Sequence, residues 1–479
     1  MTEDIALLSA TEMVRRFCAG SLTPLAVMEA VFARIDALNP TLTAYVALDR
    51  ERALAAARAA SEALTRGRAA EAPPLHGVPV SIKDVTAVAG LPLTYGSVLH
   101  ASEIATEDAL IVQRLKAAGA IVVGKTNTPD FAFGGNTVNA LFGATRNPWD
   151  PRMTAGGSTG GGAVAVATGM GPIAAGGDLG GSLRTPAAFC GVVGFRTTPG
   201  LVPIWPNPTP WDSYVVEGTI ARTVADSARS LTAVAGPDPR APLSYDFDKR
   251  ALLAAIETPS VKGWRVAWTP DLDGLLPVEP ETAATVERAA GAFLELGARV
   301  ERAAPDFREL LEVVLPSRGL LMVARHAEKL PRHRDRLPPA LVWNTEQGLA
   351  LTSAEIANGE KMRGVLMERA RRFFETYDIL LLPTEAVAPF PVEQDFPTEI
   401  NGVPLDNPIH WFALAYAITV IGHPAMSVPA GFTGGGLPVG MQIVGRRRCE
   451  DQVIRAAAAF EAARPWADKL PPTVAALAR

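Results

Sequence analysis

Residues 156–191 read GGSTGGGAVAVATGMGPIAAGGDLGGSLRTPAAFCG and set two serines among paired glycines. Ser158 lies in the first glycine cluster, and Ser182 lies 24 residues later in the second. Glycine loses more backbone entropy on folding than any other residue, so such a concentration needs a reason. Either the backbone adopts angles that other residues rarely reach, or its N–H groups come very close to another group.

Strand and helix patterns alternate on both sides of this segment. Residues 77–85 (GVPVSIKDV) predict a strand, residues 105–119 an amphipathic helix that ends at Gly119, and residues 120–127 a buried strand. Further strands are predicted in WRVAWTP, DILLLPT and PVGMQIVG, with helices near 223, 280–296, 353–376 and 450–463. This alternation predicts an α/β protein whose sheet is covered by helices on both faces.

The first 70 residues differ from the rest in their sequence pattern, which predicts helices. One of these helices has Thr23 as its N-cap and Pro24 at its first position, and it is expected to stop at Asn39-Pro40. No low-complexity linker follows. We therefore expect a helical segment at 1–70 that packs on an α/β domain at 71–479, with one structural domain overall.

The composition excludes several classes of partner. The 479 residues carry a net charge of −5, which gives no reason to expect a nucleic acid or an anionic membrane. Three scattered cysteines are too few for a disulfide framework or a metal knuckle. The N-terminal residues lack the apolar core of a signal peptide, and the longest apolar stretches are short for a membrane span. We expect a cytoplasmic enzyme, monomer or homodimer, acting on a small molecule.

The motifs of several other site types are absent or weak. No P-loop lysine follows either glycine cluster, no H-E-x-x-H occurs, and the six histidines form no close metal-ligand pair, so neither metal nor cofactor is expected. Gly156–Gly160 does match the G-x-S-x-G nucleophile elbow, and four histidines follow it: His326, His333, His410 and His423. An elbow follows a strand, whereas residues 147–155 predict a loop, so this interpretation is disfavoured.

The second glycine cluster predicts an anion-binding backbone. Leu179, Gly180, Gly181 and Ser182 present consecutive N–H groups that can hold the oxyanion formed when Ser182 attacks a carbonyl. A serine needs a base, and that base can be a lysine. Lys83 lies within the strand predicted at 77–85. Burial can depress its pKa from about 10.4 by the roughly two to three units that a neutral base requires.

These residues lie within blocks that resemble the amidase-signature hydrolases. The blocks span most of the chain: 77–85, GKTNTPDFAFGGNT at 124–137, FGATRNPWDP at 142–151, 156–161, 176–200, 221–228, 377–384 and 422–446. The resemblance implies a large twisted mixed sheet in one α/β domain and a Ser-cisSer-Lys triad. Ser182 is then the nucleophile, Ser158 the bridging serine with a cis peptide, and Lys83 the base. Residues 179–182 form the oxyanion hole.

The same resemblance implies an amide-bond hydrolase (EC 3.5.1) that works through an acyl-enzyme without metal or cofactor. Its pocket segment corresponds here to Ala132, Phe133, Gly134 and Gly135, whose small residues leave room for a bulky acyl side. We expect aryl amides or carbamates (urethanes) as substrates, with esters also open. Thr159 and Gly162 replace common serines of the family, which puts the substrate rather than the mechanism in doubt.

Three other interpretations stay open at this point. The chain resembles the A subunit of the tRNA-dependent amidotransferase, a glutaminase that works with a partner, and it can also be a binding protein that keeps the fold without turnover. Trp205, Trp211, Trp411 and Phe412 can line an aromatic pocket or anchor loops. Cys190, in the apolar sequence AAFCG, is expected to be a buried structural thiol.

Overall fold

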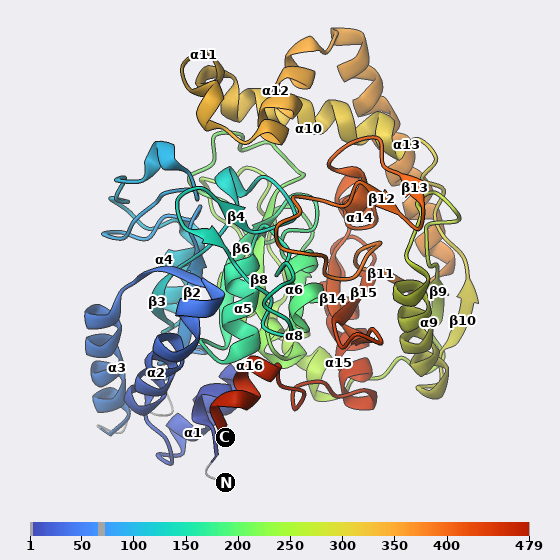
Figure 1. Cartoon of the computed structure of the whole chain (residues 1–479). Coiled ribbons are helices and arrows are strands. Elements are labelled where there is room, and N and C mark those ends of the chain that lie inside the picture. Colours follow the sequence, from blue (N-terminus) through green and yellow to red (C-terminus); the bar gives the residue numbers. More distant parts are fainter. Residues whose placement is uncertain (1–2, 66–71, 479) are drawn as a thin grey trace.

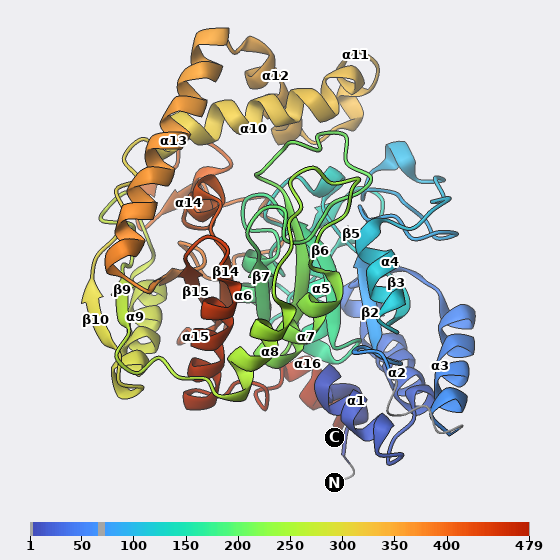
Figure 2. The ribbon, with the colours of Figure 1, turned by 180° about the vertical axis from the view of Figure 1, so that it is seen from behind.

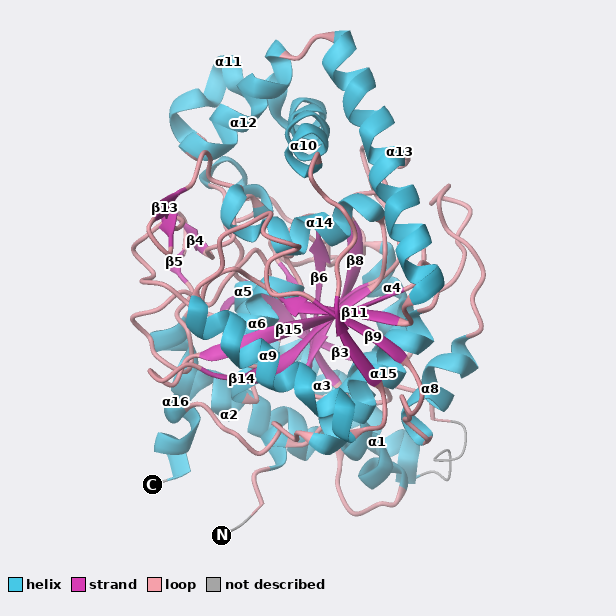
Figure 3. Cartoon of the chain, turned by 90° about the vertical axis from the view of Figure 1, so that its right-hand side faces the viewer, coloured by secondary structure: helices cyan, strands magenta, loops and turns pink. Residues whose placement is uncertain are grey.

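An eleven-stranded mixed sheet runs through the protein in this computed structural model, which describes residues 3–65 and 72–478 (Figure 1). β2 is parallel to β3 and β6, whereas β8 is antiparallel to β6, and the strands fan out with a strong twist (Figure 3). The strands, in sheet order, are β1 (Tyr45–Leu48), β3 (Ile121–Thr126), β2 (Pro79–Lys83), β6 (Ile173–Asp178), β8 (Val216–Ala221), β7 (Val193–Arg196), β14 (Ala425–Phe432), β15 (Pro438–Gly445), β11 (Ile379–Pro383), β9 (Arg265–Trp268) and β10 (Arg299–Arg302). The predicted α/β class and mixed sheet are confirmed.

Helices cover both faces because successive strand residues point to opposite sides. In β11, Ile379 and Leu381 join one core, whereas Leu380 and Leu382 join the other. The first core packs against α4 (Leu110–Ala117), α7 (Val224–Val234), α8 (Lys249–Glu257), α9 (Pro280–Glu295) and α15 (Glu450–Ala463). The opposite face packs against α2 (Pro24–Leu42), α3 (Arg50–Thr65), α5 (Gly160–Thr168), α6 (Arg184–Cys190), α13 (Ser353–Thr376) and α14 (Ala413–Ile421).

The N-terminal segment contains a strand that the sequence did not predict. After α1 (Ala10–Cys18) and α2, β1 adds to the sheet edge antiparallel to β3, before α3 begins. Thr23 caps α2 as expected, since its side chain accepts a hydrogen bond from the Ala26 amide at 3.2 Å. The boundary expected between residues 70 and 71 lies outside the described residues.

The expected end of α2 at Asn39-Pro40 is wrong. The helix continues through Pro40 to Leu42, and Thr43 closes it in the left-handed region with φ 50°. A proline in the last turn removes one backbone hydrogen bond, whereas continuing the helix buries Leu42 completely in the core. The Thr43 amide then donates to the carbonyl of Asn39 at 2.9 Å.

A layer of helices lies across one end of the sheet (Figures 1 and 2). It consists of α10 (Leu310–His326), α11 (Leu330–His333), α12 (Pro339–Ala350) and the start of α13; only α13 was predicted. α10 and α12 cross where Gly319 meets Gly348, and a Cβ on Gly348 would lie 2.2 Å from the Gly319 carbonyl oxygen. This close crossing fixes the position of Arg318, the residue before it.

Candidate active site

Lys83 and Ser158, far apart in the sequence, are in direct contact. Ile82 points into one core, so Lys83, the last residue of β2, points to the opposite face, where α5 begins. The Lys83 Nζ donates a hydrogen bond to the Ser158 Oγ at 2.7 Å. Ser158 itself is buried in the loop before α5, and the Gly157–Ser158 peptide bond is cis.

The surroundings of Lys83 favour its neutral form. The side chain is only 1% exposed, and burial lowers its pKa to about 7, although the charge of Asp178 acts in the opposite direction. The neighbouring Asp84 does not contact this amine, because it pairs with Lys125 at 3.3 Å on the other side. Lys83 can therefore accept a proton near neutral pH.

Ser182 lies in the loop between β6 and α6, within reach of solvent. It is half-buried, whereas Ser158 is buried. The carbonyl of Ser182 accepts a hydrogen bond from the Thr159 amide at 3.2 Å, which ties this loop to the one that carries Ser158. This hydrogen bond therefore joins the two loops that carry the glycine clusters.

Asp178 stabilises the conformation of the loop that carries Ser182. Its carboxylate accepts from the amides of Gly181 at 3.0 Å and Leu183 at 3.2 Å. Burial alone would raise the pKa of Asp178, but the guanidinium groups of Arg184 and Arg196 at 2.9 and 3.2 Å hold it well below its usual range. Asp178 is therefore a buried anion that supports the loop.

The backbone beside Ser182 offers free donors. Of the four amides expected in the oxyanion hole, that of Gly181 is already bonded to Asp178, whereas those of Leu179, Gly180 and Ser182 have no acceptor within the described ranges. Gly181 has φ 117°, and a Cβ on Gly180 would lie 2.5 Å from the Tyr416 ring. Glycine is required at both positions, by conformation at one and by contact at the other.

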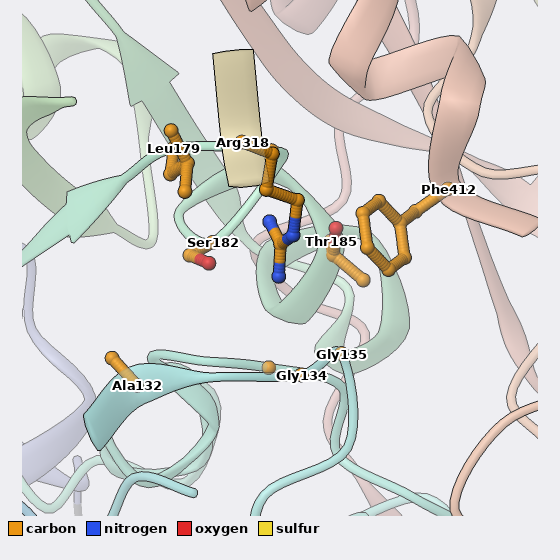
Figure 4. Close-up of a pocket in the computed structure, with 10 residues that line it drawn as sticks. Ala132, Gly134, Gly135, Leu179, Ser182, Thr185, Arg318 and Phe412 are labelled. Atoms are coloured by element: carbon orange, nitrogen blue, oxygen red, sulfur yellow. The ribbon is translucent and has the colours of Figure 1, made fainter. Parts of the chain in front are cut away.

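A cavity that is open to solvent lies in front of these donors (Figure 4). Three of the four predicted pocket residues line it, whereas the ring of Phe133 packs instead against the Arg318 guanidinium at 4.6 Å. The remaining lining comes from the two serine loops, α6, α10 and the turn before α14. The full lining is Ala132, Gly134, Gly135, Gly157, Leu179, Gly180, Ser182, Thr185, Arg318 and Phe412.

Sequence reasoning missed Thr185 and Arg318. Thr185 lies three residues after Ser182, in the first turn of α6, and recognising a helix that begins after the second glycine cluster would have found it. Arg318 had no local signal, because α10 itself was not predicted. Of the four aromatic candidates, Phe412 lines the cavity and Trp411 lies buried behind Gly135. Trp211 is exposed, and the Trp205 ring packs against the Arg240 guanidinium at 4.5 Å.

No histidine of the described part of the chain hydrogen-bonds to Ser158 or Ser182 or lines the cavity. His326 packs against Phe131, and the His423 Nδ1 contacts the carbonyl of Gly445 at 2.8 Å. Burial lowers the pKa of His326 to about 3 and that of His423 to about 4. The loop before Ser158 also contains no strand, so the histidine-based elbow has no support here.

The other candidate groups have structural environments. Cys190 is fully buried, and burial raises the pKa of its thiol. Across residues 3–65 and 72–478, no three histidine, cysteine or acidic side chains gather in a group that could hold a metal ion. No helix in those ranges combines the length and the apolar character needed to cross a bilayer.

This arrangement suits acyl transfer from a carbonyl compound. A lysine whose pKa is about 7 bonds to one serine, and a second serine faces a cavity beside three free amides. The lysine supplies a proton acceptor, and the amides supply fixed positive dipoles for a developing oxyanion. Nothing in this set requires a change of redox state.

Comparisons with known proteins agree with this chemistry. A family model described as Amidase matches residues 26–454. An acylamidase of Rhodococcus erythropolis is 41% identical over 475 residues, covering 98% of each chain. The A subunit of the glutamyl-tRNA(Gln) amidotransferase of a Picosynechococcus species is 32% identical, covering 93% of this chain and 96% of the relative. A crystal structure of a bacterial aryl acylamidase of the amidase-signature family has a TM-score of 0.90 at 32% identity, covering 97% and 98%.

Proposed function

Because this chain belongs to the amidase-signature family and is an amidase of class EC 3.5.1, we propose that it hydrolyses small aryl amides through an acyl-enzyme on Ser182. One observation carries the proposal: the 2.7 Å contact between Lys83 and Ser158. Through this contact the buried amine of Lys83 can exchange a proton with Ser158, and the loop of Ser158 is hydrogen-bonded to the loop of Ser182. The aryl acylamidase structure supports the choice of substrate class.

The proposed reaction begins when the Ser182 Oγ attacks the amide carbonyl carbon. Its proton passes to the Ser158 Oγ, while the Ser158 proton passes to the Lys83 Nζ. The amides of Leu179, Gly180 and Ser182 stabilise the carbonyl oxygen of the tetrahedral intermediate. Collapse breaks the C–N bond, and the proton on Lys83 returns through Ser158 to the departing amine. Water then attacks the acyl-enzyme in the same way and releases the acid.

The shape of the cavity supports an aryl or other bulky substituent. Ala132, Gly134 and Gly135 leave one wall without large side chains, and the Phe412 ring offers a flat apolar surface at one side of the cavity. Aryl carbamates and esters place the same carbonyl beside Ser182 and are further candidates. Turnover of p-nitroanilides and aryl carbamates is expected; turnover of short aliphatic amides alone contradicts the aryl preference.

The glutaminase function is the second candidate, since the A subunit of an amidotransferase is 32% identical to this chain over nearly its full length. It predicts ammonia release from glutamine and co-purification with a larger partner chain. The higher identity to an acylamidase favours the acylamide substrate over glutamine. Rapid hydrolysis of p-nitroanilides by the isolated chain, with no ammonia from glutamine, is the expected result.

Labelling with a fluorophosphonate tests the assigned nucleophile and base together. Peptide mass spectrometry of the wild type is expected to find one adduct, on Ser182, and none in Lys83→Ala. Lys125→Ala is a matched control, because Lys125 is also buried but bonds to the carbonyl of Pro92 instead. An adduct on Ser158 contradicts the proposal. An unlabelled wild type that also turns over no amide, ester or carbamate supports a binding protein instead.

A further inference from the structure

The cavity beside Ser182 is lined by a buried arginine that the acyl-transfer steps leave without a role. Arg318 is 5% exposed and extends from α10 into the cavity, with its guanidinium between Ser182 and Phe412 (Figure 4). Its Nε donates to the Asn344 Oδ1 of α12 at 3.0 Å, which fixes the direction of the group. The terminal nitrogens are left facing the cavity.

Aromatic rings hold the guanidinium in place without neutralising it. Its central carbon lies 4.6 Å from the ring centre of Phe133, 5.8 Å from that of Phe412 and 5.9 Å from that of Tyr416. Ring faces stabilise a cation and hold a planar guanidinium in a fixed orientation. Burial lowers the pKa of Arg318, an effect that Tyr416 partly offsets, but an arginine stays charged at neutral pH.

No carboxylate of the described chain pairs with this cation. The charge of Asp178 is already shared by Arg184 and Arg196. Glu385, behind Thr185, has a pKa that burial raises to about 8, so it is uncharged at neutral pH. Burying a charge without a counter-ion costs free energy of folding, and a bound ligand with a negative charge would offset that cost.

We propose that Arg318 binds a carboxylate on the acyl portion of the substrate, so that ω-carboxyacyl amides are preferred over their neutral isosteres. This proposal rests on the amidase function proposed above. We place the carboxylate on the acyl portion because Arg318 packs on Phe133. Phe133 belongs to the segment 132–135, which is expected to line the acyl side of the cavity. A guanidinium offers two parallel N–H groups that match the two oxygens of a carboxylate.

Matched p-nitroanilides test the proposal. Succinyl and 4-methylpentanoyl p-nitroanilide have the same shape but differ in charge, and glutaryl and 5-methylhexanoyl p-nitroanilide extend each by one methylene. The wild type is expected to show a higher kcat/KM for one charged member than for its neutral partner. In Arg318→Met that ratio is expected to fall by about tenfold to a hundredfold, the usual range for a charged hydrogen bond.

Two further variants separate binding from folding. Arg318→Lys keeps the charge but loses the paired donors, and an intermediate ratio is expected. Arg363→Met is the matched control, because Arg363 also packs on a tyrosine, 3.8 Å from the ring centre of Tyr214, but does not line the cavity. Its ratio is expected to match that of the wild type. Equal ratios in the wild type and both Arg318 variants overturn the proposal.

A readout without turnover keeps this test separate from the proposed function. If no p-nitroanilide is hydrolysed, the aryl-amide function fails, and the rate of fluorophosphonate labelling of Ser182 takes its place. Succinanilate is then expected to protect wild-type Ser182 better than 4-methylpentananilide does, and to lose that advantage in Arg318→Met. Equal protection by the two compounds in the wild type overturns the Arg318 proposal.

Discussion

The amine of Lys83 donates a hydrogen bond to the hydroxyl of Ser158 at 2.7 Å, and the effect of burial on its pKa outweighs the opposing charge of Asp178. Burial lowers the pKa of Lys83 to about 7, and the base must be neutral to accept a proton. We therefore expect kcat/KM to rise as the pH increases through about 7.

Replacing this lysine is expected to remove both turnover and the rise with pH. Lys83→Ala leaves Ser158 without a proton acceptor, so activity is expected to fall by about 10² to 10⁴-fold. A pH profile of the residual activity checks the assignment. A bell-shaped profile centred near pH 6 that persists in Lys83→Ala points to a histidine instead.

The same burial makes Lys83 a burden on stability at neutral pH. Its pKa is about 10.5 in the unfolded chain and about 7 when folded, so the unfolded state binds more protons between these values. The destabilisation caused by burying Lys83 is therefore absent above about pH 10.5, and it grows as the pH decreases toward 7. Lys83→Met removes the effect, so its stability relative to the wild type is expected to be about 2 kcal/mol more favourable at pH 7 than at pH 9. Urea unfolding at both pH values measures this difference.

The sequence predicted the parts of the site that depend on local pattern. Lys83 was singled out as a lysine within a predicted strand, and Ser182 by the glycine-rich backbone around it. The role of Ser158 came only from the resemblance to the family. The helices at 280–296, 353–376 and 450–463 were likewise visible as amphipathic segments, and the structure confirms them within a residue or two at each end.

The parts that failed depend on contacts between distant segments. Arg318 reaches the cavity only because α10 crosses α12 at Gly319 and Gly348, and nothing near Arg318 in the sequence encodes that crossing. The Gly181 amide donates its hydrogen bond to Asp178, and this bond depends on how two arginines orient the Asp178 carboxylate. The continuation of α2 through Pro40 depends on the core into which Leu42 packs. Tertiary packing decided all three.

Gly180 is expected to tolerate no side chain. A Cβ there would lie 2.5 and 2.8 Å from two carbons of the Tyr416 ring, so Gly180→Ala must displace the ring or the amide that faces the cavity. Loss of one oxyanion donor typically lowers kcat by about 10² to 10³-fold. Steady-state kinetics on a p-nitroanilide measure the effect.

Gly291→Ala provides the control for that substitution. Gly291 lies within α9, and a Cβ there would meet nothing within 4 Å. Unchanged kcat is expected, with a gain of about 0.5–1 kcal/mol in the free energy of unfolding, since alanine favours a helix interior. A Gly180→Ala enzyme as active as Gly291→Ala contradicts the assignment of the oxyanion donors.

Glu385 is expected to limit activity at alkaline pH. Thr185, which lines the cavity, donates a hydrogen bond to its carboxyl group, and a Cβ on Gly181 would lie 3.3 Å from the Glu385 Oε1. Burial raises the pKa of Glu385 to about 8, so the group is uncharged at neutral pH and ionises above that value. A negative charge behind the oxyanion loop opposes the oxyanion of the intermediate, so kcat is expected to fall as the pH increases through about 8.

Glu385→Gln tests this limit because glutamine keeps an acceptor for Thr185 but does not ionise. The fall above pH 8 is expected to disappear, while the rise through about 7 that belongs to Lys83 stays in place. Glu217→Gln is the matched control: burial also raises the pKa of Glu217 to about 8, but this residue lies in β8 and does not line the cavity. If Glu217→Gln removes the alkaline fall and Glu385→Gln does not, the charge that opposes the oxyanion comes from β8 and not from behind Thr185.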